Sequence, residues 1–292
     1  MAEFLQLLVS GLATGAIYAL AAMGFSLLWQ TSQTINFAQG EFVMLPAFLM
    51  LSAMKLLGLS IYAAFFLALA VSALLLGLAF KRLLVDPMIR HGVLPLVIAS
   101  IALGLFMRES VKLIYGAEAR PFPDALPQGV YRVAGVAVSF HDVAVLGVVF
   151  VLVLALQRFL SHSRVGRAMQ AVAQNPETAL VLGVPVGRMV LYTFVINAAL
   201  VSVAAVLITP VYLAKFDNGS SIGLIAFIAA IVGGFNQIRG ALLGGLLIGV
   251  VDNLSGAYIS AAYRDAFPLL LLIVVILFRP QGILGRAQER RL

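Results

Sequence analysis

Cysteine is missing from this sequence, and charged residues are scarce. None of the 292 residues is cysteine, which excludes disulfide bonds and thiolate chemistry. Only 11% of the residues are charged, whereas 62% are hydrophobic, and the mean hydropathy is +1.07. As a soluble globule, a chain of this composition would have an apolar surface nearly everywhere. The composition therefore predicts a polytopic membrane protein.

The residue patterns of metal, nucleotide and nucleic-acid sites are also missing. The three histidines, His91, His141 and His162, lie far apart, and none has a second ligand at metal-site spacing. The sequence contains no G-x-x-x-x-G-K-[ST] loop to hold a nucleotide phosphate. Its formal charge of +7 comes from basic residues scattered at the ends of apolar runs. We expect this chain to bind no metal, no cofactor and no nucleic acid.

Long apolar runs predict an all-α transmembrane helical bundle of eight to ten spans, forming one domain over residues 1–292. A helix of about 20 residues crosses a hydrocarbon core of about 30 Å. The count is least fixed at the polar segment 30–41 and at the glycine-containing segment 233–240, either of which could be a break. The predicted spans are residues 4–29, 42–57, 60–80, 94–115, 139–158, 188–212, 222–237, 240–258 and 265–279.

The distribution of basic residues predicts the orientation of these spans. Lysine and arginine accumulate on the cytoplasmic side of membrane proteins. This bias places the N-terminus outside and the C-terminus in the cytoplasm, and the N-terminus lacks the pattern of a cleaved secretory signal. The residues assigned to the cytoplasm are Lys81, Arg82, Arg90, Arg158, Arg164, Arg167, Arg188, Arg279, Arg286, Arg290 and Arg291.

Two segments outside the spans have a local pattern of their own. Residues 116–142 contain three prolines and then the run YRVAGVAV at 131–138, in which Gly135 is flanked by β-prone residues. This pattern predicts an extracytoplasmic loop with a short hairpin. Residues 161–188 are polar and helix-patterned. They predict a helix over 164–173, followed by a second short helix, on the cytoplasmic side.

The second short helix carries clear start and stop signals. Asn175 is a good N-cap residue, Pro176 suits the first helical position, and Gly183 follows the end. The motif formed by Glu177, Thr178, Ala179 and Gly183 resembles the E-A-A-x-x-x-G coupling motif of ATP-binding-cassette (ABC) importer permeases. In that family this segment docks into a groove of the ATPase subunit.

Further motifs resemble one branch of that superfamily, the LivH-like permeases of branched-chain amino acid importers, over nearly the whole chain from Gly11. They are GAIYAL at 15–20, INFAQGE at 35–41, GRAMQAVAQN at 166–175, GALLGG at 240–245 and FRPQG at 278–282. The chain departs from the usual family pattern at Gln39, where histidine is common, and at Asn236 and Arg239, where glycine and proline are more usual. These departures concern the substrate more than the class.

The resemblance implies a permease subunit in the inner membrane of a bacterium that imports branched-chain or similar hydrophobic amino acids by alternating access. ATP and Mg would be bound by two partner ATPase subunits. A related second permease would complete a heterodimer, with a homodimer as the alternative, and an extracytoplasmic amino-acid-binding protein would deliver the substrate. The residues implied in ATPase coupling are Arg164, Gly166, Arg167, Asn175, Pro176, Glu177, Thr178, Ala179, Leu180 and Gly183.

Several polar residues are expected at membrane depth. Asn36, Gln39 and Glu41 surround a break in the apolar pattern, and broken helices often line transport pathways. The alternative for Glu41 is an ordinary helix start. Asn197, alone in the sixth span, is a pathway candidate or an interhelical hydrogen-bonding residue.

Other features have structural interpretations. Arg108, Glu109 and Lys112 predict an ion pair at a helix end, and Asp252 is either buried polar glue or the end of a span. The spacing of six glycines indicates close helix packing. They are Gly11, Gly15, Gly240, Gly244, Gly245 and Gly249.

Two other functions remain open from the residues alone. One is an ion-coupled secondary transporter or channel that works without an ATPase, with Glu41 or Asp252 as the coupling carboxylate. The other is a permease for a different solute, such as urea, an amide or a sugar, because a fold does not fix the substrate.

Overall fold

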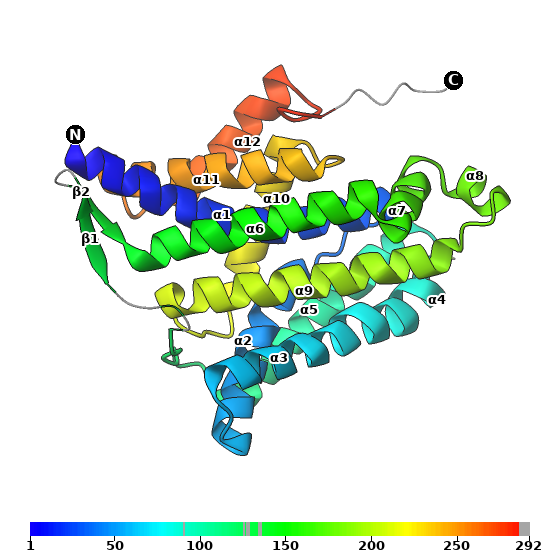
Figure 1. The fold of residues 1–292 in the computed structure, drawn as a ribbon, viewed down its shortest axis with the longest axis horizontal. Helices are drawn as coiled ribbons and strands as arrows, with labels where there is room; N and C mark the ends of the chain where they lie inside the picture. Colours follow the sequence, from blue (N-terminus) through cyan, green and yellow to red (C-terminus); the bar gives the residue numbers. More distant parts are fainter. Residues whose placement is uncertain (90, 125, 127–128, 134–135, 286–292) are drawn as a thin grey trace. The chain divides into compact units, whose positions relative to one another are not determined.

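The structure is a computed structural model that describes residues 1–89, 91–124, 126, 129–133 and 136–285. Predictions for Arg90, Gly135, Arg286, Arg290 and Arg291 lie outside these residues. The fold is helical, which confirms the predicted all-α class (Figure 1). The elements are α1 (Ala2–Ser32), α2 (Gln39–Leu57), α3 (Ile61–Ser72), the π-helical η1 (Ala73–Ala79) and η2 (Lys81–Val85), α4 (Asp86–Ile89), α5 (Val93–Tyr115), β1 (Val130–Val133), β2 (Val136–Ser139), α6 (Phe140–His162), α7 (Arg164–Gln174), α8 (Pro176–Val181), α9 (Val186–Tyr212), α10 (Asn218–Gly233), α11 (Ile238–Tyr258) and α12 (Ala266–Phe278).

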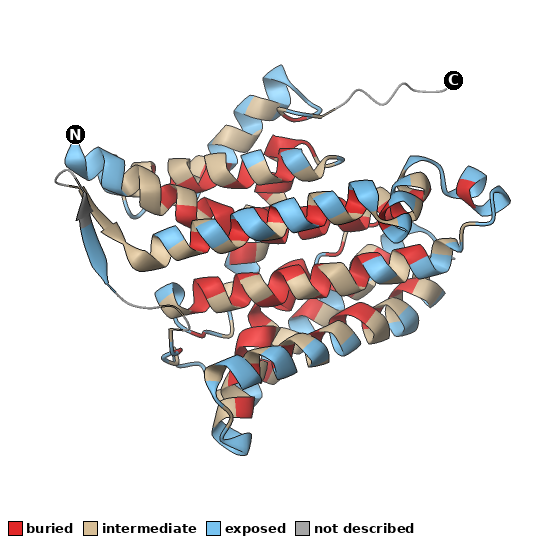
Figure 2. Ribbon diagram, viewed as in Figure 1, coloured by how far each residue is buried: buried red, intermediate tan, exposed pale blue. Residues whose placement is uncertain are grey.

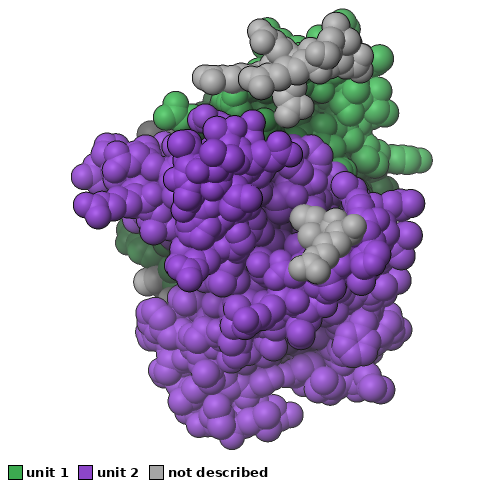
Figure 3. All heavy atoms as spheres, turned by 90° about the vertical axis from the view of Figure 1, so that its right-hand side faces the viewer, with its two compact units in different colours: residues 1–26, 126–149, 224–292 green, residues 27–125, 150–223 purple. Residues whose placement is uncertain are grey.

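The chain divides into two compact units (Figure 3). Unit 1 comprises residues 1–26, 126–149 and 224–292, and unit 2 comprises residues 27–125 and 150–223. Each unit therefore combines segments that are distant in the sequence.

Seven helices among the described residues are long and apolar enough to cross a membrane. They are α1, α2, the continuous helix Ile61–Met88, α5, α6, α9 and α11. The remaining predicted spans, 222–237 and 265–279, coincide with α10 and α12, which have only 16 and 13 residues. At a rise of 1.5 Å per residue, these two helices extend about 24 Å and about 20 Å. They are shorter than the hydrocarbon core of about 30 Å, so seven full-length spans and two shorter apolar helices stand where nine spans were expected.

Unit 2 is built around α9, which has a nearly continuous buried face (Figure 2). This helix packs along η1, α2 and α3, and Figure 1 shows it running beside α3. Aromatic rings link these helices, since the ring centroid of Phe80 lies 5.0 Å from that of Phe42 and 5.6 Å from that of Phe194.

Unit 1 joins the first part of α1 to α11 through very close backbone contacts. A Cβ atom added at Gly245 would lie 2.5 Å from Ala19 Cα, and one at Gly15 would lie 2.7 Å from the Gly245 carbonyl oxygen. No residue larger than glycine fits at such an approach without a backbone shift. In the same unit, β1 and β2 pair antiparallel as a hairpin, with Val130 opposite Ser139.

Candidate functional site

The segment 161–188 folds into two short capped helices, α7 and α8. Ser163 Oγ accepts a hydrogen bond of 2.8 Å from the Gly166 backbone N–H and so caps α7. Gly166 is buried, and a side chain there would collide with the backbone of Phe159 and Leu160. Gly166 therefore allows α7 to fold back against the end of α6, while Arg164 and Arg167 remain exposed.

The second helix, α8, has the start and stop signals that its sequence contains. Asn175 Oδ1 accepts a hydrogen bond of 2.9 Å from the Thr178 N–H, and Pro176 occupies the first helical position. Gly183 adopts a φ of +81°, in the left-handed region that favours glycine. Asn175, Pro176, Glu177 and Thr178 are all exposed.

An exposed apolar surface distinguishes α8 and the residue that follows it. Ala179 is the buried residue of this helix at 2% exposure. Leu180, Val181 and Leu182 are 64%, 87% and 75% exposed. Three adjacent apolar side chains at such exposure, beside polar Glu177, form a surface suited to contact with another molecule.

The structure brings the candidate pathway residues together inside unit 2. Between α1 and α2 the chain leaves the helical conformation at residues 33–38, and Asn36 Oδ1 accepts a 3.0 Å hydrogen bond from the Ala38 N–H. Gln39 and Asn197 exchange two side-chain hydrogen bonds, of 2.7 Å and 2.9 Å. The prediction of an interhelical hydrogen bond at Asn197 is confirmed, and its partner is Gln39.

Glu41 is the buried carboxylate of this polar centre, at 5% exposure. Its Oε1 accepts a 3.1 Å hydrogen bond from Ser220 Oγ, which in turn accepts one of 3.3 Å from Arg108 Nη1. Glu41 Oε2 has no hydrogen-bond partner among the described residues, and neither has Asn36 Nδ2. One acceptor and one donor are therefore left unpaired, although buried polar groups are usually satisfied.

Two helix starts meet at this carboxylate. A side chain at Gly40 would collide with the backbone of Gly219, and one at Gly219 would collide with the Glu41 carboxyl group. The first turns of α2 and α10 therefore touch, and the unpaired N–H groups of a helix start favour a negative charge. Sequence reasoning did not identify Ser220 or Gly219, because only the fold brings residues 41 and 220 together.

The remaining predicted residues lie elsewhere. Arg108, Glu109 and Lys112 form the expected contacts at a helix end, with Lys112 Nζ 3.5 Å from Glu109 Oε2. Gly11, Gly15, Gly245 and Gly249 line the contact between α1 and α11, while Gly240 and Gly244 face the end of α10.

Asp252 also differs from Glu41 in its surroundings. At 2% exposure, it binds Arg264 through both carboxylate oxygens, with Oδ1–Nε and Oδ2–Nη2 distances of 2.7 Å and 2.6 Å. This geometry supports the interpretation as polar glue. Within the described ranges, no group of three or more histidine, aspartate or glutamate side chains could hold a metal ion.

Comparisons with known proteins agree with this arrangement of helices. Residues 7–276 match the family model described as a branched-chain amino acid transport system permease component. The chain is 34% identical to the high-affinity branched-chain amino acid transport system permease protein BraD of Pseudomonas aeruginosa, over 99% of this chain and 98% of that one. It is 33% identical to LivH of Escherichia coli K12, over 99% of this chain and 97% of that one.

A more distant relative comes from an archaeon. It is a probable LivH permease of Methanocaldococcus jannaschii, 28% identical over 92% of this chain and 89% of that one. No solved structure matches the chain. Because the family model and the bacterial relatives cover nearly the whole sequence, the chain belongs to the family of permease components of branched-chain amino acid transport systems.

Proposed function

We propose that this permease is the membrane subunit of an ATP-driven importer that carries branched-chain or similar hydrophobic amino acids into the cytoplasm. The family membership supports the transport role, and the printed names of the relatives support the substrate class. The single structural observation behind ATP coupling is α8, a capped helix with three adjacent exposed apolar residues. Such a surface needs a partner.

In this proposal, α8 docks on a separate ATPase subunit that binds ATP and Mg. The contact would be formed by Leu180 and its neighbours, with Glu177, Arg164 and Arg167 on the polar rim. Closure of two ATPase subunits on ATP would move two such segments and shift the permease between inward-facing and outward-facing states. The nucleotide acts because it binds those two states with different free energies.

The proposed translocation pathway passes the polar centre of unit 2. A zwitterionic amino acid needs an acceptor for its ammonium group and a donor for its carboxylate. Glu41 Oε2 and Asn36 Nδ2 are an unpaired acceptor and an unpaired donor, five residues apart around the same chain break. An ionisable residue inside a membrane protein is costly and usually functional. The Gln39–Asn197 pair would hold the break in position.

The complete assembly would contain a second permease, two ATPase subunits and an extracytoplasmic binding protein that delivers the substrate. We expect a heterodimer with a related permease, in the inner membrane of a bacterium, with the N-terminus outside and the C-terminus in the cytoplasm. The segment 161–188 then faces the cytoplasm and the segment 116–142 faces outward.

The test is purification of the tagged chain from its own membranes in mild detergent, with identification of the proteins that copurify. We expect an ATPase with a phosphate-binding loop, and ATP hydrolysis stimulated by leucine-loaded binding protein. Glu177→Ala and Gly183→Val should abolish this stimulation and uptake while the protein remains in the membrane. Gln170→Ala, an exposed change on α7, is the matched control and should leave both intact.

Two outcomes would contradict the proposal. Unaltered uptake in Glu177→Ala and Gly183→Val would exclude a coupling role for α8. Uptake by this chain alone in liposomes, driven by an ion gradient and without an ATPase, would support a secondary transporter instead.

A further inference from the structure

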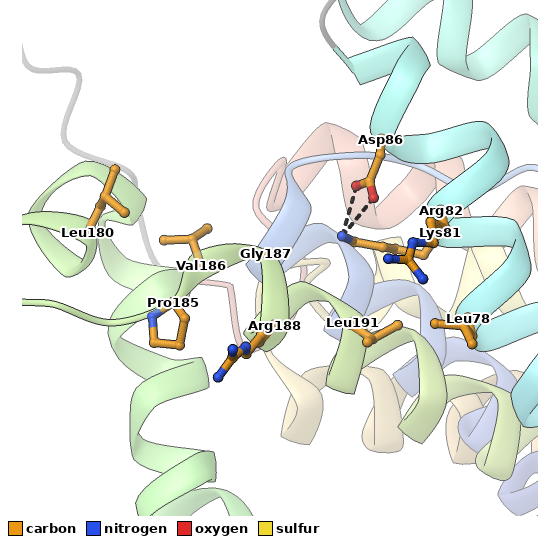
Figure 4. Close-up of a pocket in the computed structure, with 10 residues that line it drawn as sticks. All are labelled: Leu78, Lys81, Arg82, Asp86, Leu180, Pro185, Val186, Gly187, Arg188 and Leu191. Carbon is orange, nitrogen blue, oxygen red and sulfur yellow. Dashed lines mark hydrogen bonds and ion pairs between the residues drawn. The ribbon is translucent and has the colours of Figure 1, made fainter.

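A cavity of about 520 Å³ lies in unit 2 beside the start of α9, between the end of the helix Ile61–Met88 and α8 (Figure 4). Its polar lining consists of three cationic side chains, Lys81, Arg82 and Arg188, and one carboxylate, Asp86. This volume is within the range of about 300–1,000 Å³ that is typical of small-molecule sites. The lining therefore carries an excess of positive charge.

Only one of these cations is neutralised within the described chain. Lys81 Nζ lies 2.9 Å from Asp86 Oδ1 and donates a 2.9 Å hydrogen bond to Oδ2, as the dashed lines in Figure 4 show. The side chains of Arg82 and Arg188 are exposed and form no ion pair or hydrogen bond with the described residues. Two guanidinium groups, which suit the geometry of phosphate oxygens, are thus available to an anion.

The surroundings of the cavity are apolar. Leu78 and Leu191 contribute to its wall. On the same long apolar helix as Arg82, Leu74 and Leu83 are 56% and 77% exposed. Exposed leucines on a membrane-crossing helix face lipid chains, so the cavity opens at the boundary between the apolar helix surface and its charged end.

We propose that this cavity binds the phosphodiester headgroup of an anionic membrane lipid, held by Arg82 and Arg188 beside the Lys81–Asp86 pair. Basic pockets between helices at a membrane surface recognise such headgroups. The adjacent leucines would contact the glycerol and the upper part of the acyl chains. Leu180 and Pro185 also line the cavity, so a bound lipid touches both ends of the connection from α8 to α9. The proposal does not depend on the transported substrate.

The experiment is native mass spectrometry of the full-length permease, purified in detergent and mixed with phosphatidylglycerol. Each arginine near a membrane surface contributes about a fivefold gain in affinity for anionic lipid. We expect the first bound lipid to be held about fivefold more weakly by Arg82→Gln or Arg188→Gln, and about 25-fold more weakly by the double variant. Phosphatidylcholine, which has no net charge, should bind no better to the native protein than to the double variant.

A second variant fills the cavity without changing its charge. Gly187 is exposed in the first turn of α9, and a Cβ atom added there would lie 4.0 Å from Lys81 Nζ. Gly187→Leu should therefore fold normally, as judged by its melting temperature, and should lose the lipid. Arg158→Gln, an exposed change on α6 away from the cavity, is the control and should retain it.

Three results would overturn the proposal. The first is equal retention of phosphatidylglycerol by the native protein, the double variant and Gly187→Leu. The second is displacement of the lipid by inorganic phosphate at equal concentration, because the site would then accept a free anion. The third is a double variant that keeps the lipid but loses a copurifying ATPase, because the arginines would then contact a protein.

Discussion

Two buried carboxylates, Asp252 in unit 1 and Glu41 in unit 2, have opposite surroundings. Both are almost inaccessible, at 2% and 5% exposure. Asp252 uses both oxygens in a bidentate contact with Arg264. Glu41 uses only Oε1, and its Oε2 has no hydrogen-bond partner among the described residues.

The difference separates a structural carboxylate from one that is available to a ligand. A buried charge is costly, and full pairing offsets that cost. The contact of Asp252 links α11 to the segment just before α12, so it fixes the chain there. Glu41 remains partly unpaired beside a broken helix, where an approaching ammonium group would complete its hydrogen bonds.

The largest effect should follow from removing Asp252. Asp252→Ala leaves Arg264 without its anion, and breaking a buried pair costs about 3–5 kcal/mol. We expect the lower end of this range, because the Arg264 side chain is 36% exposed. The measurement is the melting temperature in detergent. The double variant Asp252→Ala/Arg264→Ala should recover part of the loss, and an unchanged melting temperature in the single variant would remove the structural assignment.

Glu41→Gln should affect transport rather than stability. The substitution keeps the size of the side chain and removes the charge, and a hydrogen bond to a charged group is worth about 1.5–3 kcal/mol. We therefore expect uptake to fall about tenfold or more, with little change in melting temperature. Glu109→Gln, on a carboxylate that is 58% exposed, is the control. Normal uptake by Glu41→Gln would show that the unpaired oxygen does not contact substrate.

The amide pair beside Glu41 should have a smaller, structural effect. Gln39→Ala leaves the buried side chain of Asn197 without this partner, which costs about 1–3 kcal/mol. In a double-mutant cycle with Asn197→Ala, the double variant should lose less stability than the sum of the two single variants. Strict additivity would contradict direct coupling between the two amides.

The exposed ion pair Glu109–Lys112 should show the smallest effect. Its side chains are 58% and 45% exposed, and solvent screens such pairs to about 0–1 kcal/mol. Lys112→Ala should change the melting temperature by less than either buried variant. A loss as large as that of Asp252→Ala would mean that exposure does not separate the two classes of carboxylate.

The limits of prediction are clearest at particular residues. The caps at Ser163 and Asn175 and the left-handed Gly183 could be predicted because the signals of a short helix are local. The lengths of α10 and α12 could not, since apolar composition shows where a helix can lie in a membrane and not where it ends. Arg264 was missed as the partner of Asp252 because no sequence pattern relates two residues across a turn of irregular chain.

The sequence by itself determined the membrane class, the family and the outline of the segment 161–188. These depend on composition, on ordered motifs and on residues close together in the chain. Only the tertiary structure decided that Glu41 meets Ser220, that Gln39 pairs with Asn197, and that Lys81, Arg82 and Arg188 line one cavity. The physical reason is that such contacts join residues far apart in the chain. Their energies depend on the distances and burial that packing creates.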